Sequence, residues 1–373
     1  MCAGAENQEE TEGRSQSRTN FTWEGAKIKH KKLLVDQVPS AARVQKIIKA
    51  MSDRRILAVG DLMLDEFIWG KVSRISPEAP VPVVAVDRET FYPGGAANVA
   101  RNLHAFTPGS SVLGLAGDDS AGVRLRDLLR AGGIDTAGIV LRPDAPTTVK
   151  TRIIARTQQV VRVDREMVQP PGPGERAALL RALDAALPQV DAIIIEDYAK
   201  GLLDADLAAE IVQRARAAGR LVAVDPNPGN PLPWHGATVI KPNRHEAFAS
   251  AGVPWSEAAP DPLADHALLE VGKILLAKWQ AEQLLITLSE LGMLLLTKDG
   301  VRHHTPTRAR EVFDVSGAGD TAIALYTLAL CAGASPLEAS EIANHASGVV
   351  VGKLGTATLT PDELLASFAD HAR

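Results

Sequence analysis

The chain contains very little cysteine: Cys2 and Cys331 are the only two among 373 residues. Two cysteines are too few for the framework of a disulfide-stabilised domain or for a thiolate zinc site. Low cysteine content is typical of proteins from a reducing compartment. We therefore expect a cytoplasmic protein without structural disulfides.

Long apolar runs and an excess of positive charge are also missing. No run reaches the roughly 18 residues that cross a bilayer, and the polar N-terminus lacks the apolar region of a secretory signal. The 40 Lys and Arg residues are outnumbered by 45 Asp and Glu residues, so the formal net charge is -5. No broad positive field exists to hold nucleic acid by its phosphates. We therefore expect neither a membrane protein nor a nucleic-acid-binding protein.

The hydrophobic pattern divides the chain into a tail, a helical extension and one α/β domain. Residues 1–33 are too polar to pack and are predicted to be disordered. Residues 34–53 are predicted to form a helical extension with Ser40 as its candidate cap. In residues 54–373 short apolar strands alternate with helices, which predicts a mostly parallel central sheet with helices on both faces. Two antiparallel-looking segments, near 66–90 and 145–165, are predicted to form a small β lid over one end of the sheet.

The segment Asp314-Val-Ser-Gly-Ala-Gly-Asp320 precedes a strongly apolar helix. A glycine-rich turn at a helix start leaves backbone N–H groups free, so these groups and the helix dipole form an anion site. Gly317 and Gly319 have no Cβ and allow a phosphate to approach the backbone. Asp320 is either a favourable first-turn residue or, beside a phosphate, a base for an attacking hydroxyl.

Two other enzyme classes share parts of this pattern. Gly317-x-Gly319-x-x-Ala322 matches the dinucleotide fingerprint, but that fingerprint opens a βαβ unit. Here only about 50 residues remain and they look helical. The P-loop pattern G-x-x-x-x-G-K-[ST] and the hydrolase pattern G-x-S-x-G are absent. The sequence therefore disfavours a dehydrogenase, a P-loop enzyme and a serine hydrolase.

Polar residues follow several predicted strands at their carboxyl ends, where open α/β sheets bind ligands. Asp61 and Asp65 follow the first strand, where they could bind sugar hydroxyls or act as turn and solvated carboxylates. Gly94, Gly95 and Asn98 lie where a strand passes into a helix, and they serve either close packing or a ligand. Later strands are followed by Glu196-Asp197, Asp225-Pro-Asn227 and Lys241-Pro-Asn243-Arg-His-Glu246.

The segments G-G-A-A-N at 94–98 and D-V-S-G-A-G-D at 314–320 resemble, in order and separation, the two signatures of the PfkB (ribokinase-like) carbohydrate kinases. The resemblance covers about residues 54–370. Four further segments resemble the D-glycero-β-D-manno-heptose-7-phosphate kinases of that family: GDLMLD (60–65), SRISPEAPVP (73–82), DYAKG (197–201) and VVVGKLGT (349–356). Bifunctional relatives carry a second, nucleotidyltransferase domain, and we expect this chain to be a kinase only.

The resemblance implies a ribokinase-like α/β fold and ATP-dependent phosphorylation of heptose 7-phosphate at its anomeric hydroxyl. The product would be heptose 1,7-bisphosphate, on the route to ADP-heptose and lipopolysaccharide. The implied cofactors are ATP and Mg²⁺, with a monovalent cation as a further candidate, and the implied assembly is a homodimer through the lid. The alternatives are another PfkB kinase, for ribose, a fructose phosphate or a nucleoside, and a non-catalytic sugar- or nucleotide-binding protein of the same fold.

The resemblance also implies roles for individual residues, with no protein residue assigned as a direct metal ligand. The catalytic base would be Asp320, and the anion hole would comprise Gly317, Ala318 and Gly319. The sugar would be bound by Asp61, Asp65, Gly94, Gly95 and Asn98. The lid residues Arg74, Lys150, Arg152 and Arg162 would bind a substrate phosphate or form a solvated hairpin face. The Mg-ATP site would comprise Asn243, Glu246, Thr287, Ser289, Gly292 and Asn344.

Two positions depart from the family pattern. Residue 325 is Leu where many PfkB kinases have Gly, and residue 227 is Asn where heptose kinases often have Lys. The second difference bears on phosphate contacts, so the class of kinase is better defined by the sequence than its exact substrate.

Overall fold

The computed structural model describes residues 38–156, 158–309 and 311–369. The predicted disordered tail, residues 1–33, lies outside these ranges. Helix α1 (Ala41–Met51) begins after Ser40, whose hydroxyl accepts a hydrogen bond from the backbone N–H of Arg43 at 3.3 Å. The predicted cap is therefore confirmed. The described residues 38–40 precede the helix, so it begins later than the predicted residue 34.

The main sheet has nine strands in the order β13-β12-β11-β10-β9-β8-β1-β4-β5. Neighbours from β11 to β5 are parallel, whereas β12 and β13 add an antiparallel hairpin at one edge. The mostly parallel sheet is confirmed. The strands are β1 (Arg55–Gly60), β4 (Gly109–Gly117), β5 (Asp135–Arg142), β8 (Ala192–Glu196), β9 (Leu221–Asp225), β10 (Val239–Ile240), β11 (Gln283–Thr287), β12 (Met293–Thr297) and β13 (Arg302–Thr305).

Alternate residues of the central strands enter two separate hydrophobic clusters. In β1, Ile56 and Ala58 belong to one cluster, whereas Leu57 and Val59 belong to the other. This alternation follows from the two-residue period of a strand. Because both faces are covered, the central strands are continuous apolar runs.

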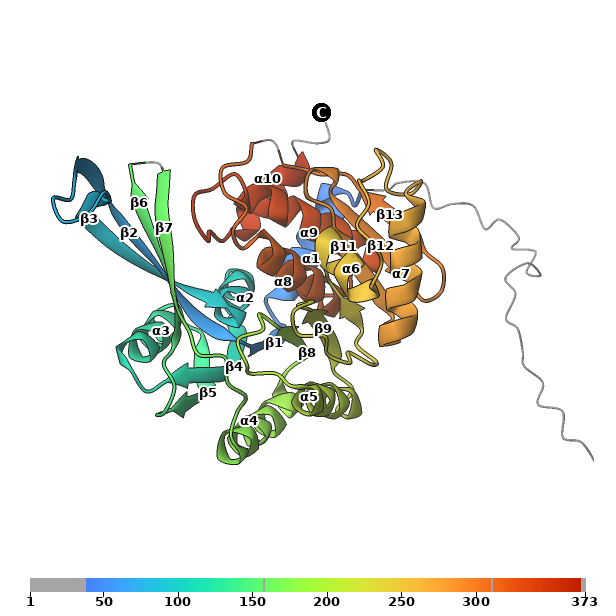
Figure 1. Cartoon of the computed structure of the whole chain (residues 1–373). Coiled ribbons are helices and arrows are strands. Elements are labelled where there is room, and N and C mark those ends of the chain that lie inside the picture. Colours follow the sequence, from blue (N-terminus) through green and yellow to red (C-terminus); the bar gives the residue numbers. More distant parts are fainter. Residues whose placement is uncertain (1–37, 157, 310, 370–373) are drawn as a thin grey trace, which may run out of the picture. The chain divides into compact units, whose positions relative to one another are not determined.

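Helices cover both faces of the sheet, as predicted (Figure 1). One face is covered by α1, α2 (Ala96–His104), α3 (Ser120–Ala131), α8 (Ala318–Cys331), α9 (Pro336–Val350) and α10 (Pro361–Ala369). The other is covered by α4 (Pro173–Ala186), α5 (Ala205–Ala217), α6 (Arg244–Ala251) and α7 (His266–Trp279). Short 3-10 turns occupy Leu187–Gln189 and Ser289–Leu291. No helix in the described part of the chain is long and apolar enough to cross a membrane.

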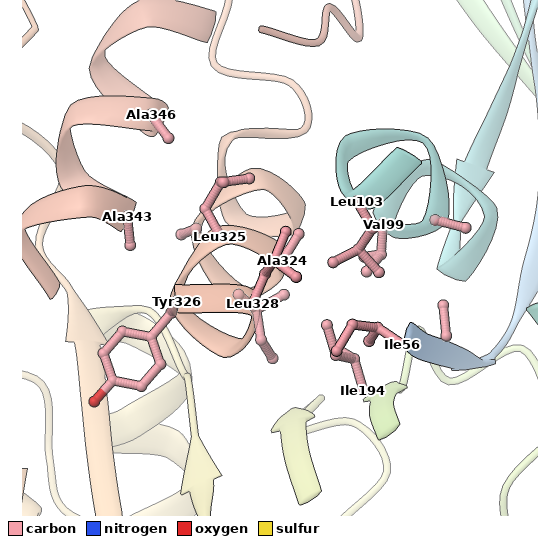
Figure 2. Close-up of a cluster of buried hydrophobic side chains, with 14 of the residues drawn as sticks. Ile56, Val99, Leu103, Ile194, Ala324, Leu325, Tyr326, Leu328, Ala343 and Ala346 are labelled. Carbon is pink, nitrogen blue, oxygen red and sulfur yellow. The ribbon is translucent and has the colours of Figure 1, made fainter. Parts of the chain in front are cut away.

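Helix α8 lies within the first hydrophobic cluster, between α2 and α9. Figure 2 shows Val99 and Leu103 of α2 on one side of α8, and Ala343 and Ala346 of α9 on the other. Leu325 is fully buried there. A helix that is apolar on all sides is stable only when neighbouring elements cover it. This packing places the start of α8 at the carboxyl ends of the strands.

A second sheet of four strands forms the predicted lid, in the order β3-β2-β6-β7. Its strands are β2 (Leu62–Ile75), β3 (Pro82–Gly95), β6 (Thr148–Ala155) and β7 (Gln158–Arg165). The pairs β2–β3 and β6–β7 are antiparallel, and β2 runs parallel to β6. The first hairpin is longer than the predicted 66–90. Every residue of β7, an edge strand, is exposed.

Candidate active site

The start of α8 is shaped by glycine. Gly317 is the N-cap and has a φ of 80°, a left-handed conformation that favours glycine. A Cβ on Gly317 would lie 2.9 Å from Nδ2 of Asn98. The N–H of Ala318 donates to the carbonyl of Val315 at 3.2 Å and closes the turn. The helix start can therefore lie directly against α2.

Asp320 lies in the first turn of α8 and is held by two donors. Asn98 Nδ2 donates to its Oδ2 at 2.7 Å, and the Tyr198 hydroxyl donates to its Oδ1 at 2.6 Å. Its surroundings leave only 6% of the residue exposed. This burial, with the charge of Asp225 nearby, raises the pKa of Asp320 to about 6, although both hydrogen bonds act to lower it. Asp320 is therefore an ionised carboxylate at neutral pH whose proton affinity suits a general base.

Asp61 anchors the loop that carries Tyr198. Its carboxylate accepts hydrogen bonds from the backbone N–H groups of Tyr198, Lys200 and Leu202, at 2.9, 3.1 and 3.2 Å. Burial raises the pKa of Asp61, and these three bonds oppose the rise. Both carboxylate oxygens are thus already bonded to the chain. The role of Asp61 in sugar binding stays a prediction, and in this structure Asp61 positions Tyr198.

Asp65 pairs with one of the predicted lid cations. Its Oδ1 accepts a hydrogen bond from Arg152 at 2.5 Å. A Cβ on Gly94 would lie 2.3 Å from the other oxygen of Asp65, so the missing side chain leaves room for the carboxylate. Gly95, with a φ of 62°, is the N-cap of α2. The β2–β3 hairpin thus positions Asp65 at the base of the lid.

The four predicted lid cations do not converge. Lys150 lies over the ring of Tyr198, with Nζ 5.6 Å from the ring centroid, close to the Asp65–Arg152 pair. Burial lowers the pKa of Lys150, because a desolvated ammonium favours its neutral form. Arg74 is exposed on the distal part of β2, and Arg162 is exposed and paired with Asp164. The structure therefore brings Lys150 and Arg152 to the site and leaves the other two away from it.

One cavity of about 680 Å³ connects Asp320 with the predicted nucleotide residues. Helix starts, strand ends and α9 all contribute to its lining. The predicted residues that line it are Asn243, Glu246, Thr287, Ser289, Gly292, Gly317, Ala318, Gly319, Asp320 and Asn344. Residues more than 100 positions apart thus form one wall, and the cavity is large enough for a drug-sized ligand.

Asn243 and Glu246 form a reciprocal cap at the start of α6. Asn243 Oδ1 accepts from the N–H of Glu246 at 2.9 Å, and Glu246 Oε2 accepts from the N–H of Asn243 at 2.8 Å. The three-residue spacing of the motif is that of a capping box. Burial raises the pKa of Glu246. The motif therefore has a structural role beside its predicted role in binding Mg-ATP.

Further charged groups near Asp320 had no predicted role. The buried Lys241 and the partly buried Asp225 form an ion pair at 2.9 Å, and a Cβ on Gly319 would lie 3.3 Å from Nζ of Lys241. Glu196 is fully buried, and neither carboxylate oxygen has a hydrogen-bond partner among the described residues. Its burial and the charge of Asp225 raise its pKa well above the usual value. Their positions at strand ends were the only sequence signal for these groups.

The donor set of this region fits a divalent cation. Carboxylate oxygens of Glu196, Asp225 and Asp320 lie within 4.8 Å of one another. Mg²⁺ prefers oxygen ligands and is commonly bound through one or two carboxylates together with substrate phosphates. The oxygens of Glu196 lack a hydrogen-bond partner within residues 38–156, 158–309 and 311–369, whereas those of Asp320 are bonded to Asn98 and Tyr198. Glu196 is therefore the group best placed to hold the ion, together with Asp225 beside it, whose Oδ2 pairs with Lys241.

The fold and the site together define a ribokinase-like phosphotransferase. The chain has a mostly parallel sheet with a β lid, and a glycine turn and a buried carboxylate line a large cavity. The chain belongs to the pfkB family of carbohydrate kinases, because the model of that family matches residues 53–363. It is 43% identical over 326 residues to the bifunctional protein HldE of Paramagnetospirillum magneticum, covering 87% of this chain and 64% of that protein. The HldE of Caulobacter vibrioides is 44% identical, with 85% and 64% covered. The chain thus spans a little under two thirds of the length of these relatives.

Solved structures of other sugar kinases share the fold. Ribokinase of Arabidopsis thaliana, complexed with ribose and ATP, superposes with a TM-score of 0.64 at 17% identity, covering 84% of this chain and 98% of that one. Phosphofructokinase-2 of Escherichia coli, in complex with potassium, gives a TM-score of 0.67 at 18% identity, with 86% and 99% covered. These likenesses confirm the predicted ribokinase-like fold.

Proposed function

We propose that the chain transfers the γ-phosphoryl group of ATP to the anomeric hydroxyl of D-glycero-β-D-manno-heptose 7-phosphate. The observation that carries this proposal is Asp320, buried and held by two donors at the glycine turn, on the wall of the cavity formed by the nucleotide residues. The choice of sugar is supported by the four heptose-kinase-like segments and by the similarity to HldE proteins. The product would be heptose 1,7-bisphosphate, on the route to ADP-heptose and lipopolysaccharide.

In this mechanism the nucleotide occupies the cavity of about 680 Å³, with its γ-phosphate at residues 317–319. The anomeric oxygen forms the new P–O bond as the bond between the γ-phosphorus and ADP breaks. The hydroxyl proton passes to Asp320. The positive end of α8 stabilises negative charge on the transferred group. A bound Mg²⁺ would neutralise phosphate charge, and Glu196 and Asp225 with Glu246 are the residues that would hold it.

The base of the lid supplies the sugar side of the site. Asp65 offers a carboxylate for hydroxyl groups, and Lys150 and Arg152 are cations at its edge. Burial disfavours the charged form of Lys150, and the negative charge of a phosphate on the sugar would stabilise that form. This chemistry favours a phosphorylated sugar over a neutral one.

A substrate screen tests the proposal. ADP release would be measured with purified protein, Mg-ATP and one acceptor at a time: heptose 7-phosphate, fructose 6-phosphate, ribose or adenosine. We expect the largest kcat/KM for heptose 7-phosphate. A larger value for another acceptor would assign the chain to a different substrate within the family. Binding of ATP without turnover on any acceptor would identify a non-catalytic binding protein.

We also propose that the protein acts in the cytoplasm as a homodimer formed through the lid, with a monovalent cation as a candidate activator. The dimer is supported by β7, an edge strand with all eight residues exposed. Unpaired strand edges readily pair with another strand. Val161 and Val163 on this strand are 44% and 52% exposed, which a second lid would cover.

A further inference from the structure

Arg101 is a cation close to Asp320 that the sequence did not single out. It lies on α2, one turn after Asn98, and is half-buried. Among the described residues no carboxylate lies within ion-pair distance of its guanidinium. Its hydrogen bonds go instead to Oδ1 of Asn98 at 3.2 Å and to the carbonyl of Thr356 at 3.3 Å. Asp65 attracts this charge from beyond ion-pair distance, and the guanidinium lies 5.6 Å from the centroid of the Tyr92 ring. A half-buried charge without a direct ion pair is costly, so the position of Arg101 needs an explanation.

Asn98 connects Arg101 to Asp320. Its Oδ1 accepts from Arg101, its Nδ2 donates to Asp320, and it has no exposed surface where water could compete. A guanidinium can only donate hydrogen bonds, and an ionised carboxylate can only accept them. Only one of the two orientations of the amide therefore satisfies both neighbours.

The orientation of Asn98 would be lost in each turnover without Arg101. Once Asp320 has taken the hydroxyl proton, it can form a hydrogen bond with either orientation of the Asn98 amide. It can accept from Nδ2, or its own O–H can donate to Oδ1 of a reversed amide. Asp320 then no longer distinguishes the two orientations. Arg101 stays charged and keeps Oδ1 on its own side. The donor to Asp320 is thus in place when the proton leaves again.

We propose that Arg101 is a positioning residue that acts through Asn98 on Asp320, an inference that rests on the proposed role of Asp320 as the base. The surrounding packing supports a rigid arrangement. Asn102 Nδ2 donates to the carbonyl of Asn98 at 2.9 Å, and the Thr321 hydroxyl donates to Oδ1 of Asn102 at 2.8 Å. Figure 2 shows the apolar contact of the same two helices, with Val99 and Leu103 facing α8. Because these contacts fix α2 against α8, the contact between Asn98 and Asp320 can change mainly through rotation of the Asn98 side-chain amide.

A double-mutant cycle tests this coupling. Arg101→Met keeps most of the bulk and removes the charge, and we expect kcat to fall about 10- to 100-fold. The KM values for ATP and sugar should stay within about threefold, because the hydrogen bonds of Arg101 go to Asn98 and to the backbone of Thr356. In an Asn98→Ala background the same change should alter kcat less than about twofold, since coupled sites are not additive. If Asn98→Ala does not fold, Asn98→Leu keeps the size and removes the amide.

Two results would overturn the inference. One is that Arg101→Met lowers kcat in the Asn98→Ala background as much as in the unmodified protein. The other is that Arg101→Met raises the sugar KM and leaves kcat unchanged. Arg124→Met is the matched control, because Arg124 packs on Phe91 of β3 as Arg101 packs on Tyr92 of the same strand, but Arg124 does not contact Asn98. We expect its kcat to equal that of the unmodified protein.

A spectroscopic readout separates this inference from the proposed function. The side-chain ¹⁵N–¹H signals of Asn98 can be assigned by their loss in the Asn98 variant. We expect them to shift or broaden in Arg101→Met and to stay unchanged in Arg124→Met, whichever sugar is the substrate. Unchanged signals in Arg101→Met would show that Arg101 does not orient the amide. An unmodified protein without kinase activity would refute the proposed function alone.

Discussion

At the scale of single residues, the site depends on a few charged side chains that are removed from water. Asp320, Glu196 and Lys241 are buried at the carboxyl ends of the strands, and Asp225, the partner of Lys241, is partly buried. Burying charge is unfavourable unless partners compensate it. Asp320 has two hydrogen-bond donors, whereas Glu196 has none among the described residues. Such uncompensated groups are typical of functional sites.

The raised pKa of Asp320 predicts the pH dependence of activity. A general base must be deprotonated, and burial raises the pKa of Asp320 to about 6. Activity should therefore be low below pH 6 and rise to a plateau above pH 7. The measurement is kcat/KM for the sugar between pH 5 and pH 8. A flat profile across this range would exclude Asp320 as the titrating base.

Asp320→Asn provides the matched variant for that profile. The Tyr198 hydroxyl can reverse and accept from the new amide, so both neighbours keep a partner. The loss of a base should reduce kcat at least ~100-fold. The raised pKa also means that the charged form of Asp320 destabilises the fold, and this cost grows as pH rises from the ordinary pKa of 3.8 to about 6 and is complete above that. The variant should therefore be no less stable at pH 7, as thermal unfolding would show, and calorimetry should still detect ATP binding.

Gly94→Ala tests the sugar side of the site. A Cβ at this position would lie 2.3 Å from Oδ2 of Asp65, so the carboxylate must move. Loss of a hydrogen bond to a charged group costs about 1.5–3 kcal/mol, so the sugar KM should rise at least tenfold. The ATP KM should stay within about twofold. Gly174→Ala is the control, because nothing lies within 4 Å of its Cβ position. Equal changes in both KM values would contradict a role in the sugar site.

At the scale of elements, local signals located most helices and strands but set their ends poorly. The mostly parallel sheet and the cap of α1 agree with the sequence prediction. The lid strands β2 and β3 are each 14 residues long, beyond the predicted segment 66–90. The residues beyond that segment, 62–65 and 91–95, lie at the base of the lid and are mostly buried. Pairing between the strands extends them, and this pairing is a tertiary interaction that a local pattern does not contain.

Helix α1 should contribute to stability and leave catalysis unchanged. Val44, Ile47 and Met51 are buried in the hydrophobic cluster that contains α8, and Arg43 of α1 donates a hydrogen bond to the carbonyl of Gly333, just after the C-terminal end of α8. Ile47→Ala should lower the free energy of unfolding by about 2–4 kcal/mol through lost burial and a cavity, with kcat unchanged. Denaturant unfolding measures this loss. Lys46→Ala, at an exposed position of the same helix, should change it by less than about 0.5 kcal/mol.

At the scale of the whole molecule, the lid connects the sugar site to the proposed dimer. Strand β2 carries Asp65 at its base, and β6 carries Lys150 and Arg152 beside it. The outer strand β7 is exposed along its whole length. If a second lid covers β7, association would also restrain the strands that hold the sugar residues.

Val163→Lys tests the dimer. A lysine on an exposed edge strand disfavours pairing with another strand. Light scattering should give twice the chain mass for the unmodified protein and the mass of one chain for the variant. Val168→Lys, at an exposed valine just outside β7, should leave the dimer intact. A monomeric unmodified protein would refute the proposed assembly.

The sequence by itself determined the local chemistry of this protein. Several features depend only on interactions within a few residues: the apolar strands, the Ser40 cap, the Asn243–Glu246 spacing and the glycine turn before Asp320. Those patterns also predicted the mostly parallel sheet and which strand ends carry polar groups. Hydrogen bonding and side-chain periodicity within one element follow directly from neighbouring residues.

Only the tertiary structure decided which of these groups meet. Tyr198 and Asn98 reach Asp320 from 122 and 222 positions away, and Arg101 joins them through Asn98. In a parallel sheet each strand is followed by a crossover, so residues distant in sequence gather at one edge. Which side chains then fall within hydrogen-bond distance depends on how α2 packs against α8. That packing results from apolar contacts over the whole domain, which no single segment of the sequence encodes.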